Sequence, residues 1–373
     1  MTDEEILEVE NLIVRFYTYE GIVEALDGVN LKIRKGEILG LVGETGCGKS
    51  VTSLSTLVLV PPPGSIEAGK IFLKTQGKKV NLLEQDRETL RTVRGSEISM
   101  VFQEPRAYLN PVYSVENQIS EVLLVHRKEE FLKRAIETIK KKKKGSNFEL
   151  KLYQRMLEKP KSLTTKLLSK FTSKRTLKME LHNEVVALLK NMEIPDPERV
   201  AKMYPHELSG GMAQRVVIAM ALSCNPKILL ADEPTTNLDV TVQAQILQLV
   251  SLLRKNFQSS ILYVTHDLGV VAEICDRVAV MYAGNVVETA DVFEIFNNPL
   301  HPYTKALLES IPRPGKEFKS IPGVVPSLIK PPRGCRFHDR CDFAMEVCRK
   351  VKPQFLEVKK DHFVACHLYG GPK

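Results

Sequence analysis

The chain has 373 residues, of which 43% are hydrophobic and 26% charged, and its formal net charge is +8 at pH 7. This is enough for one large α/β domain with an appendage. No apolar run approaches the ~18–20 residues of a membrane-spanning helix, and the acidic start MTDEEILEVE lacks the basic and apolar regions of a signal peptide. We therefore expect a cytoplasmic protein that associates with a membrane only through partners.

The first chemical motif is the glycine-rich stretch GETGCGKS, from Gly43 to Ser50. It has the form G-x4-G-K-[ST] of a phosphate-binding loop, and the apolar run before it, Ile38–Val42, predicts a buried strand. Glycines let backbone N–H groups point into one concavity, and the helix expected after the loop directs its N-terminus at the phosphates. Lys49 is predicted to hold the β- and γ-phosphates and Ser50 a magnesium ion. The predicted nucleotide contacts are Gly43, Glu44, Thr45, Gly46, Cys47, Gly48, Lys49, Ser50 and Val51.

Positive charge is concentrated in one segment, residues 127–178, with 18 Lys or Arg against 5 Asp or Glu. The rest of the chain is therefore not basic. Apolar residues recur in this segment at helical spacing and predict two or three amphipathic helices, with a loop near residues 145–147. The lysine run Lys140–Lys144 is either a solvated loop or a contact with an anionic membrane surface. The recurring apolar residues are Phe131, Leu132, Ala135, Ile136, Ile139, Leu163, Leu167, Leu168 and Phe171.

The motif LSGGM, from Leu208 to Met212, follows the basic segment. Ser209 can cap a helix there, and Gly210 and Gly211 let backbone N–H groups approach a phosphate closely. This motif is therefore a second candidate phosphate contact.

Two further apolar strands are predicted, and each ends at a polar residue. ILLAD ends at Asp232, which is positioned to hold magnesium directly or through water, and Glu233 can accept a proton from an attacking water. ILYVT is followed by His266. Asp232 and Glu233 thus predict hydrolysis of a metal-bound triphosphate.

Seven cysteines divide into two groups. Three are scattered, and two of these are most simply small buried residues. Four crowd the C-terminal region at spacings that do not match paired C-x2-C zinc knuckles; disulfides are disfavoured in a cytoplasmic protein, and four thiolates suit zinc or an iron–sulfur cluster. The scattered cysteines are Cys47, Cys224 and Cys275, and the clustered ones are Cys335, Cys341, Cys348 and Cys366.

Together, GETGCGKS, LSGGM and ILLADEP resemble the ATP-binding-cassette family, and the resemblance runs from about Leu7 to Tyr369 with the basic segment as an interruption. It implies an α/β fold: a phosphate-loop core with an antiparallel β portion and a helical subdomain, plus a small Cys-rich C-terminal extension. We expect the ATPase domain at residues 1–290 and the extension at 291–373. The helical subdomain is expected at about 104–222, with a lysine-rich insertion at about 127–178.

The resemblance also implies roles in the site, with ATP and Mg²⁺ as ligands. Gln103, in VFQEP, would reach magnesium and the attacking water, and His266 would contact the γ-phosphate and fix that water. Phe16 would stack on adenine, with Tyr17 and Tyr19 as the next candidates.

In the family the LSGGM motif closes over the ATP of a second cassette. Ser209, Gly210 and Gly211 would therefore serve the partner's ATP, and Asp239 would lie at the interface between the two cassettes. The chain contains one phosphate loop and one such motif, so it is expected to need a partner cassette.

The C-terminal stretches HPYTKALLESIPRP and PPRGCRFHDRC resemble the extension of oligopeptide/dipeptide importer ATPases. The resemblance implies that the four clustered cysteines hold a 4Fe–4S cluster; zinc or a redox-dependent disulfide is the alternative. A metal would stabilise this short extension.

The resulting expectation is an ATPase, converting ATP and water to ADP and phosphate, that powers import of oligopeptides or dipeptides. Its expected partners are a second, non-identical ATPase subunit, two membrane-spanning permease subunits and an extracytoplasmic solute-binding protein, with no nucleic acid. It would lie peripherally on the cytoplasmic face of the membrane. Oligosaccharides or nickel are alternative solutes.

A nucleic-acid-acting ATPase of this family would carry long coiled-coil arms, for which the 104 residues between Gln103 and Leu208 are too few. A metal-sensing module with weak ATPase activity is a third hypothesis for the function.

Overall fold

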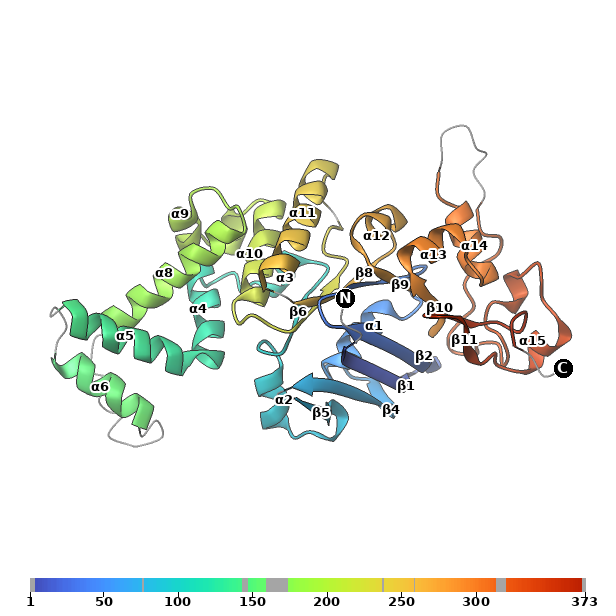
Figure 1. The fold of residues 1–373 in the computed structure, drawn as a ribbon, viewed down its shortest axis with the longest axis horizontal. Coiled ribbons are helices and arrows are strands. Elements are labelled where there is room, and N and C mark those ends of the chain that lie inside the picture. Colours follow the sequence, from blue (N-terminus) through green and yellow to red (C-terminus); the bar gives the residue numbers. More distant parts are fainter. Residues whose placement is uncertain are drawn as a thin grey trace. The chain divides into compact units, whose positions relative to one another are not determined.

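The computed structural model describes residues 4–75, 77–142, 147–158, 174–236, 238–257, 259–312 and 320–370 (Figure 1). The chain divides into two compact units. The first comprises Met1–Gln103, Lys227–Thr235 and Leu247–Lys373, and the second comprises Glu104–Pro226 and Thr236–Ile246.

The first unit begins with an antiparallel sheet of four strands in the order β2-β1-β4-β5. Long strands β1 (Glu5–Thr18) and β2 (Gly21–Arg34) form a hairpin, and β4 (Gly64–Thr75) and β5 (Lys78–Asn81) continue the sheet beside β1. Apolar side chains of β1, β2 and β4 share one core with those of the second sheet of this unit. This sheet is the antiparallel portion predicted from the sequence.

The second sheet has eight strands in the order β11-β12-β10-β9-β3-β8-β7-β6. Five of them run parallel, from β9 to β6. Their side chains are almost entirely apolar and buried, as expected for a parallel sheet covered on both faces. The parallel strands are β3 (Ile38–Val42), β6 (Ile98–Val101), β7 (Ile228–Asp232), β8 (Ser260–Thr265) and β9 (Arg277–Tyr282).

The carboxyl ends of the parallel strands lie at one edge of the sheet. Val42 pairs with Thr265, and Asp232 pairs with Val264, so β3, β7 and β8 end at the same level. Ligands of open parallel sheets bind at this edge. The loops that follow β3, β6, β7 and β8 therefore start close together.

Short helices complete the first unit. They are α1 (Lys49–Thr56), η1 (Leu82–Glu84), α2 (Arg87–Val93), α12 (Leu268–Ile274), α13 (Val292–Asn297) and α14 (Pro302–Glu309). Helix α11 (Val240–Phe257) starts in the second unit and ends in the first.

The C-terminal extension adds two strands to the large sheet instead of forming a separate layer. β10 (Asn285–Asp291) pairs with β12 (His362–Ala365), and β12 pairs with β11 (Phe355–Lys359), all antiparallel. The extension also contains η3 (His338–Arg340) and α15 (Glu346–Lys350). Its compact unit includes residues on both sides of position 290, and the expected domain boundary there remains a prediction.

The second unit is helical. Its described helices are α3 (Pro105–Tyr108), α4 (Val115–His126), α5 (Lys128–Lys142), α6 (Asn147–Glu158), α8 (Arg175–Asn191), α9 (Pro197–Lys202), η2 (Pro205–Glu207) and α10 (Gly210–Leu222), together with the first part of α11.

The basic segment contains amphipathic helices. Phe131, Leu132, Ala135, Ile136 and Ile139 of α5 are all buried, and α5 packs against α6 and α8. The sequence pattern therefore identified the buried face of α5. The second apolar pattern, at residues 163–171, and the loop predicted near residue 145 fall outside the described residues. In the described part of the chain, every helix is too short or too polar to cross a membrane.

Candidate ATP-binding and hydrolysis site

The phosphate loop has the backbone that its glycines make possible. Gly46 and Gly48 have φ of 80° and 105°, a conformation that side chains disfavour. Gly43 has no room for a side chain, because a Cβ there would lie 2.1 Å from the carbonyl oxygen of Met281. Lys49 is 6% exposed, and its Nζ donates hydrogen bonds to the carbonyls of Gly43 (2.8 Å) and Glu44 (3.1 Å). The loop thus curls around the Lys49 ammonium group.

A candidate magnesium site lies between the loop and β7. The Ser50 hydroxyl donates a hydrogen bond to Asp232 Oδ1 at 3.2 Å. Burial raises the pKa of Asp232, and the neighbouring Glu233 raises it further. A buried carboxylate with an adjacent hydroxyl is an oxygen donor set that Mg²⁺ prefers. The residues present therefore fit the ion, and the pair predicted from the sequence is brought together.

Glu233 is held between two polar side chains from neighbouring loops. Gln103 Nε2 donates to Glu233 Oε2 at 3.0 Å, and His266 Nδ1 lies 3.1 Å from Glu233 Oε1. The three residues follow β6, β7 and β8. The structure thus gathers the three residues expected to be catalytic, although they are up to 163 positions apart in the chain. The side chain of His266 is 57% exposed and that of Glu233 is 15% exposed, so the histidine faces solvent beside a largely shielded carboxylate.

Backbone strain accompanies this arrangement. Glu233 has φ of 46°, which is uncommon for a residue with a side chain. Its N–H donates to the Val264 carbonyl at 2.9 Å. Such strain persists where surrounding structure enforces it, and it is concentrated at functional sites.

The adenine-stacking candidates lie on the first hairpin. Phe16 on β1 is half-buried and packs on Gly64 of β4, where a Cβ would come within 2.6 Å of the ring. Tyr17 is 51% exposed, and Tyr19, in the hairpin turn, is 98% exposed. The assignment to Phe16 remains a prediction.

LSGGM begins a helix of the second unit. Ser209 is the N-cap of α10, and its hydroxyl accepts a hydrogen bond from the N–H of Met212 at 3.3 Å. Ser209 and Gly210 are exposed, while Gly211 packs against Val242 of α11. The same helix α11 is preceded by Asp239, whose carboxylate accepts a hydrogen bond from the N–H of Val242 at 2.9 Å.

The structure does not support the metal site expected at the four clustered cysteines. Among the described residues, no group of three or more His, Cys, Asp or Glu side chains is arranged to hold a metal ion. The four thiols are near one another: burial, together with the smaller effect of the other three thiols, raises the pKa of Cys335 to about 12. The N–H of Cys335 also donates to the Cys348 carbonyl at 2.7 Å. All four are free cysteines.

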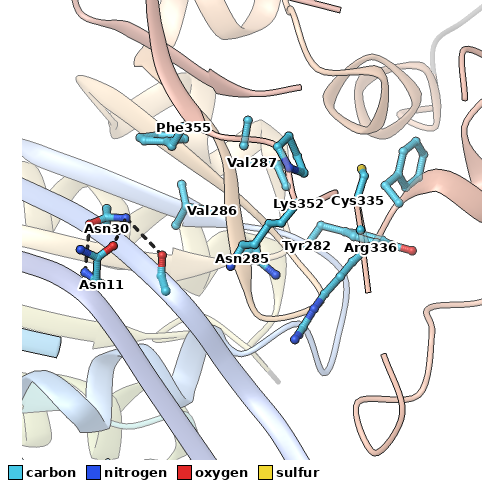
Figure 2. A pocket seen from close by; sticks show the side chains of 15 residues that line it. Asn11, Asn30, Tyr282, Asn285, Val286, Val287, Cys335, Arg336, Lys352 and Phe355 are labelled. Carbon is cyan, nitrogen blue, oxygen red and sulfur yellow. Dashed lines mark hydrogen bonds between the residues drawn. The ribbon is translucent and has the colours of Figure 1, made fainter. Parts of the chain in front are cut away.

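A cavity of about 220 Å³ lies between the first hairpin and the extension. Figure 2 shows Asn11 and Asn30 on one side of it and Cys335, Arg336 and Tyr282 on the other. No phosphate-loop residue lines it, so this cavity is separate from the nucleotide site.

The sequence did not reveal two residues of the extension that contact the phosphate loop. The Tyr303 hydroxyl accepts a hydrogen bond from the N–H of Glu44, and Arg340 forms an ion pair with the Glu44 side chain. Tyr303 and Arg340 lie 259 and 296 positions after Glu44, so no local pattern connects them. The only available signal was that both occur in the stretches that resemble the importer extension.

Comparison with known proteins identifies the class of this site. Residues 26–236 match the ABC transporter family, and residues 287–348 match the C-terminal region of oligopeptide/dipeptide transporters. Among solved structures, the dimeric ATP-binding cassette MJ0796, in a post-hydrolysis state with ADP and Pi, is similar with a TM-score of 0.55 and 25% identity, over 77% of this chain and 99% of that one. The chain belongs to the ABC transporter family and is one of its ATPases.

Its curated relatives narrow the class further. The oligopeptide transport ATP-binding protein OppD of Bacillus subtilis is 43% identical over 368 residues, covering 97% of this chain and 88% of OppD. The dipeptide transport ATP-binding protein DppD of the same organism is 42% identical over 369 residues, covering 98% of this chain and 95% of DppD. The probable peptide ABC transporter ATP-binding protein y4tR of Sinorhizobium fredii is 42% identical over 366 residues, 97% and 94% of the two chains. Within the family, this chain is an ATP-binding subunit of the oligopeptide/dipeptide type.

Proposed function

We propose that this protein hydrolyses ATP to power an importer of oligopeptides or dipeptides. The observation that carries the proposal is the placement of Glu233 between Gln103 and His266, at the sheet edge that also holds Lys49 and Asp232. The match of residues 287–348 to the transporter C-terminal region supports the solute class.

The chemistry follows from these side chains. Lys49 places positive charge beside the β- and γ-phosphates, and Ser50 with Asp232 would hold Mg²⁺, which neutralises phosphate charge when bound. Glu233 accepts a proton from a water that attacks the γ-phosphorus, and the bond from phosphorus to the ADP oxygen breaks. His266 and Gln103 fix the Glu233 carboxylate for this step. Phe16 is proposed to stack on the adenine.

Hydrolysis is proposed to require a second cassette. Ser209 and Gly210 are exposed at the N-terminus of α10, where backbone N–H groups and the helix dipole attract a phosphate. They, with Gly211, would contact the ATP of the partner, with Asp239 at the interface. We propose a non-identical ATPase subunit as that partner.

The remaining partners follow from the importer role. They are two membrane-spanning permease subunits and an extracytoplasmic solute-binding protein, so the chain would lie on the cytoplasmic face of the membrane. The exposed lysines Lys140 and Lys141 at the end of α5 support a further contact with anionic lipid, since each lysine near such a surface contributes about 1 kcal/mol.

Uptake in cells tests the function. Cells that express the transporter should accumulate a labelled di- or oligopeptide, and replacing this subunit with its Lys49→Ala variant should abolish uptake. The Asp361→Asn variant, changed in the turn between β11 and β12, is the matched control. Undiminished peptide uptake with Lys49→Ala, or Lys49-dependent uptake of oligosaccharide or nickel alone, contradicts the proposal.

The four clustered cysteines are proposed to bind a 4Fe–4S cluster, with zinc as the alternative. What supports this is the donor set of four neighbouring thiols. Protein purified anaerobically should contain about four irons per chain. Cys348→Ser should remove the iron, and Cys47→Ser should not. Stoichiometric zinc without iron would favour the alternative, and neither metal would exclude the site.

A further inference from the structure

The C-terminal extension contacts the phosphate loop through Glu44. The Arg340 guanidinium donates to both oxygens of the Glu44 carboxylate, at 2.8 and 3.1 Å. The Tyr303 hydroxyl accepts the Glu44 N–H at 3.0 Å, and the Glu44 carbonyl accepts from Lys49 at 3.1 Å. The N–H, the carbonyl and the carboxylate of Glu44 are therefore all hydrogen-bonded, and the donor to the carbonyl is Lys49, the lysine proposed to bind phosphate.

Contacts other than the one with Glu44 restrain the Arg340 side chain. Its Nε donates to the Pro322 carbonyl at 2.8 Å, its Nη1 donates to the Tyr282 hydroxyl at 3.2 Å, and its side chain is 5% exposed. The guanidinium also lies 5.7 and 5.9 Å from the ring centroids of Tyr282 and Phe337. Because the Arg340 guanidinium is restrained in this way, its two hydrogen bonds fix both the position and the orientation of the Glu44 carboxylate.

A second arginine supports the other side of the loop. Arg336 donates to the Ala283 carbonyl at 2.6 Å and to Glu24 at 2.7 Å, and its side chain lies beside Cys335 and Tyr282 in Figure 2. The next residue, Gly284, donates its N–H to the Cys47 carbonyl at 2.8 Å. The segment Cys335–Cys341 thus supports the phosphate loop directly through Arg340 and indirectly through Arg336.

We propose that Arg340 and Tyr303 are positioning residues that set the conformation of the phosphate loop and hence the affinity for Mg–ATP. The inference rests on the proposed role of Gly43–Ser50 as the nucleotide site. Between Glu44 and Gly48 the loop is held at Cys47, which is buried and accepts a hydrogen bond from Gly284, whereas nothing lies within 4 Å of a Cβ built at Gly46. The contacts at Glu44 therefore restrain the part of the loop that precedes Gly46. Losing them leaves the loop free to turn its N–H groups away from the phosphates.

The test is a double-mutant cycle on the full-length protein. Titration with magnesium and a non-hydrolysable ATP analogue should give a Kd about tenfold higher for Arg340→Gln and for Glu44→Gln, because each removes the same bidentate pair. The double variant should bind no more weakly than the weaker single variant. Arg340→Lys keeps the charge without the fork and should give an intermediate Kd.

Steady-state kinetics separate positioning from general destabilisation. In the assembled transporter, Arg340→Gln should raise KM for ATP more than it lowers kcat. The control is Asp361→Asn, which removes the ion pair between the extension and Arg34. Asparagine, like aspartate, tolerates the φ of 59° at this position. The Kd of this variant should equal that of the wild type. Additive effects in the cycle, or equal weakening in the control, would overturn the inference. Failure of the wild type to bind the analogue would instead overturn the proposed function.

Discussion

Glu233 is the residue proposed to accept the proton from the attacking water, and its neighbours hold its side chain in place. Its backbone has φ of 46° and its carboxylate is held from two sides, by Gln103 and His266. The sequence predicted all three residues: Glu233 from its place after an apolar strand, and Gln103 and His266 from the resemblance to the ATP-binding-cassette family. It could not predict the strained backbone, in which the N–H of Glu233 donates a hydrogen bond to Val264 on the neighbouring strand.

Glu233→Gln should separate binding from hydrolysis. Lys49 and Asp232 still hold Mg–ATP, so the Kd should be unchanged, while turnover falls at least about 100-fold because the attacking water loses its base. Phosphate release and nucleotide titration measure the two quantities. Glu193→Gln is the matched control, since Glu193 has a similar φ of 54° and an exposed side chain near Arg215. Near-wild-type turnover in Glu233→Gln would remove this residue from its proposed role.

A buried histidine in the extension should make stability depend on pH. Burial lowers the pKa of His301 to about 4, from 6.5. Between these values the unfolded chain binds a proton that the folded chain does not, so stability present above pH 6.5 is lost as pH falls, by up to about 1.4 kcal/mol per pH unit.

Urea unfolding at pH 7.5 and 5.5 checks this. His301 Nδ1 accepts the N–H of Tyr303 at 3.0 Å, and Asn at this position can still cap α14 without an ionisable ring. His301→Asn should therefore lose part of the pH dependence. An identical pH dependence in both proteins would show that another group is responsible.

At the scale of elements, the sequence predicted what depends on local pattern. The helical spacing of Phe131, Leu132 and Ala135 identified the buried face of α5. The glycines of GETGCGKS predicted a curled loop, in which Gly46 and Gly48 have positive φ. Pairing across the chain was not predictable in this way. β11 and β12 join the large sheet through pairing of β12 with β10, at Glu288 and Val364, and the sequence patterns of such short strands do not specify a partner.

Helices α5 and α6 should be dispensable for nucleotide binding. The phosphate-loop contacts all lie in the first compact unit, and long surface insertions cost little closure entropy. Residues 128–174 should therefore be replaceable by a short Gly/Ser linker, which retains Arg127 and its hydrogen bonds to Glu184 and Ser223.

Two measurements follow from this deletion. The Kd for Mg–ATP should stay within about twofold of wild type, and binding to anionic liposomes should weaken, as it should for the intact protein in high salt. Collapse of ATP binding in a folded deletion variant would place the insertion in the nucleotide site. Unchanged liposome binding would contradict only the proposed lipid contact.

At the scale of the whole molecule, hydrolysis is proposed to require two cassettes. Ser209→Arg places a bulky charge at the exposed start of α10 and should reduce hydrolysis by at least about tenfold, while the affinity of the same chain for Mg–ATP stays unchanged. Loss of that affinity would mean that Ser209 serves its own nucleotide.

Mixing two inactive variants of this chain tests whether the two cassettes of the pair are identical. If the cassettes are identical, mixing Ser209→Arg with Glu233→Gln protein rebuilds one intact site and restores part of the hydrolysis. The proposed non-identical pair should recover nothing on mixing. Recovered hydrolysis would correct the stoichiometry and support the sharing of sites.

The most direct measurement of the central claim, that the edge formed by β3, β7 and β8 is a nucleotide site, is Mg–ATP binding by the full-length protein and its Lys49→Ala variant. Lys49 is buried among the loop carbonyls of Gly43 and Glu44, and its charge is the loop's main electrostatic contact with the phosphates. We predict saturable binding by the wild type and an affinity at least about 100-fold lower for Lys49→Ala, with the affinity of Asp361→Asn unchanged. Equal affinities in the wild type and Lys49→Ala would contradict it.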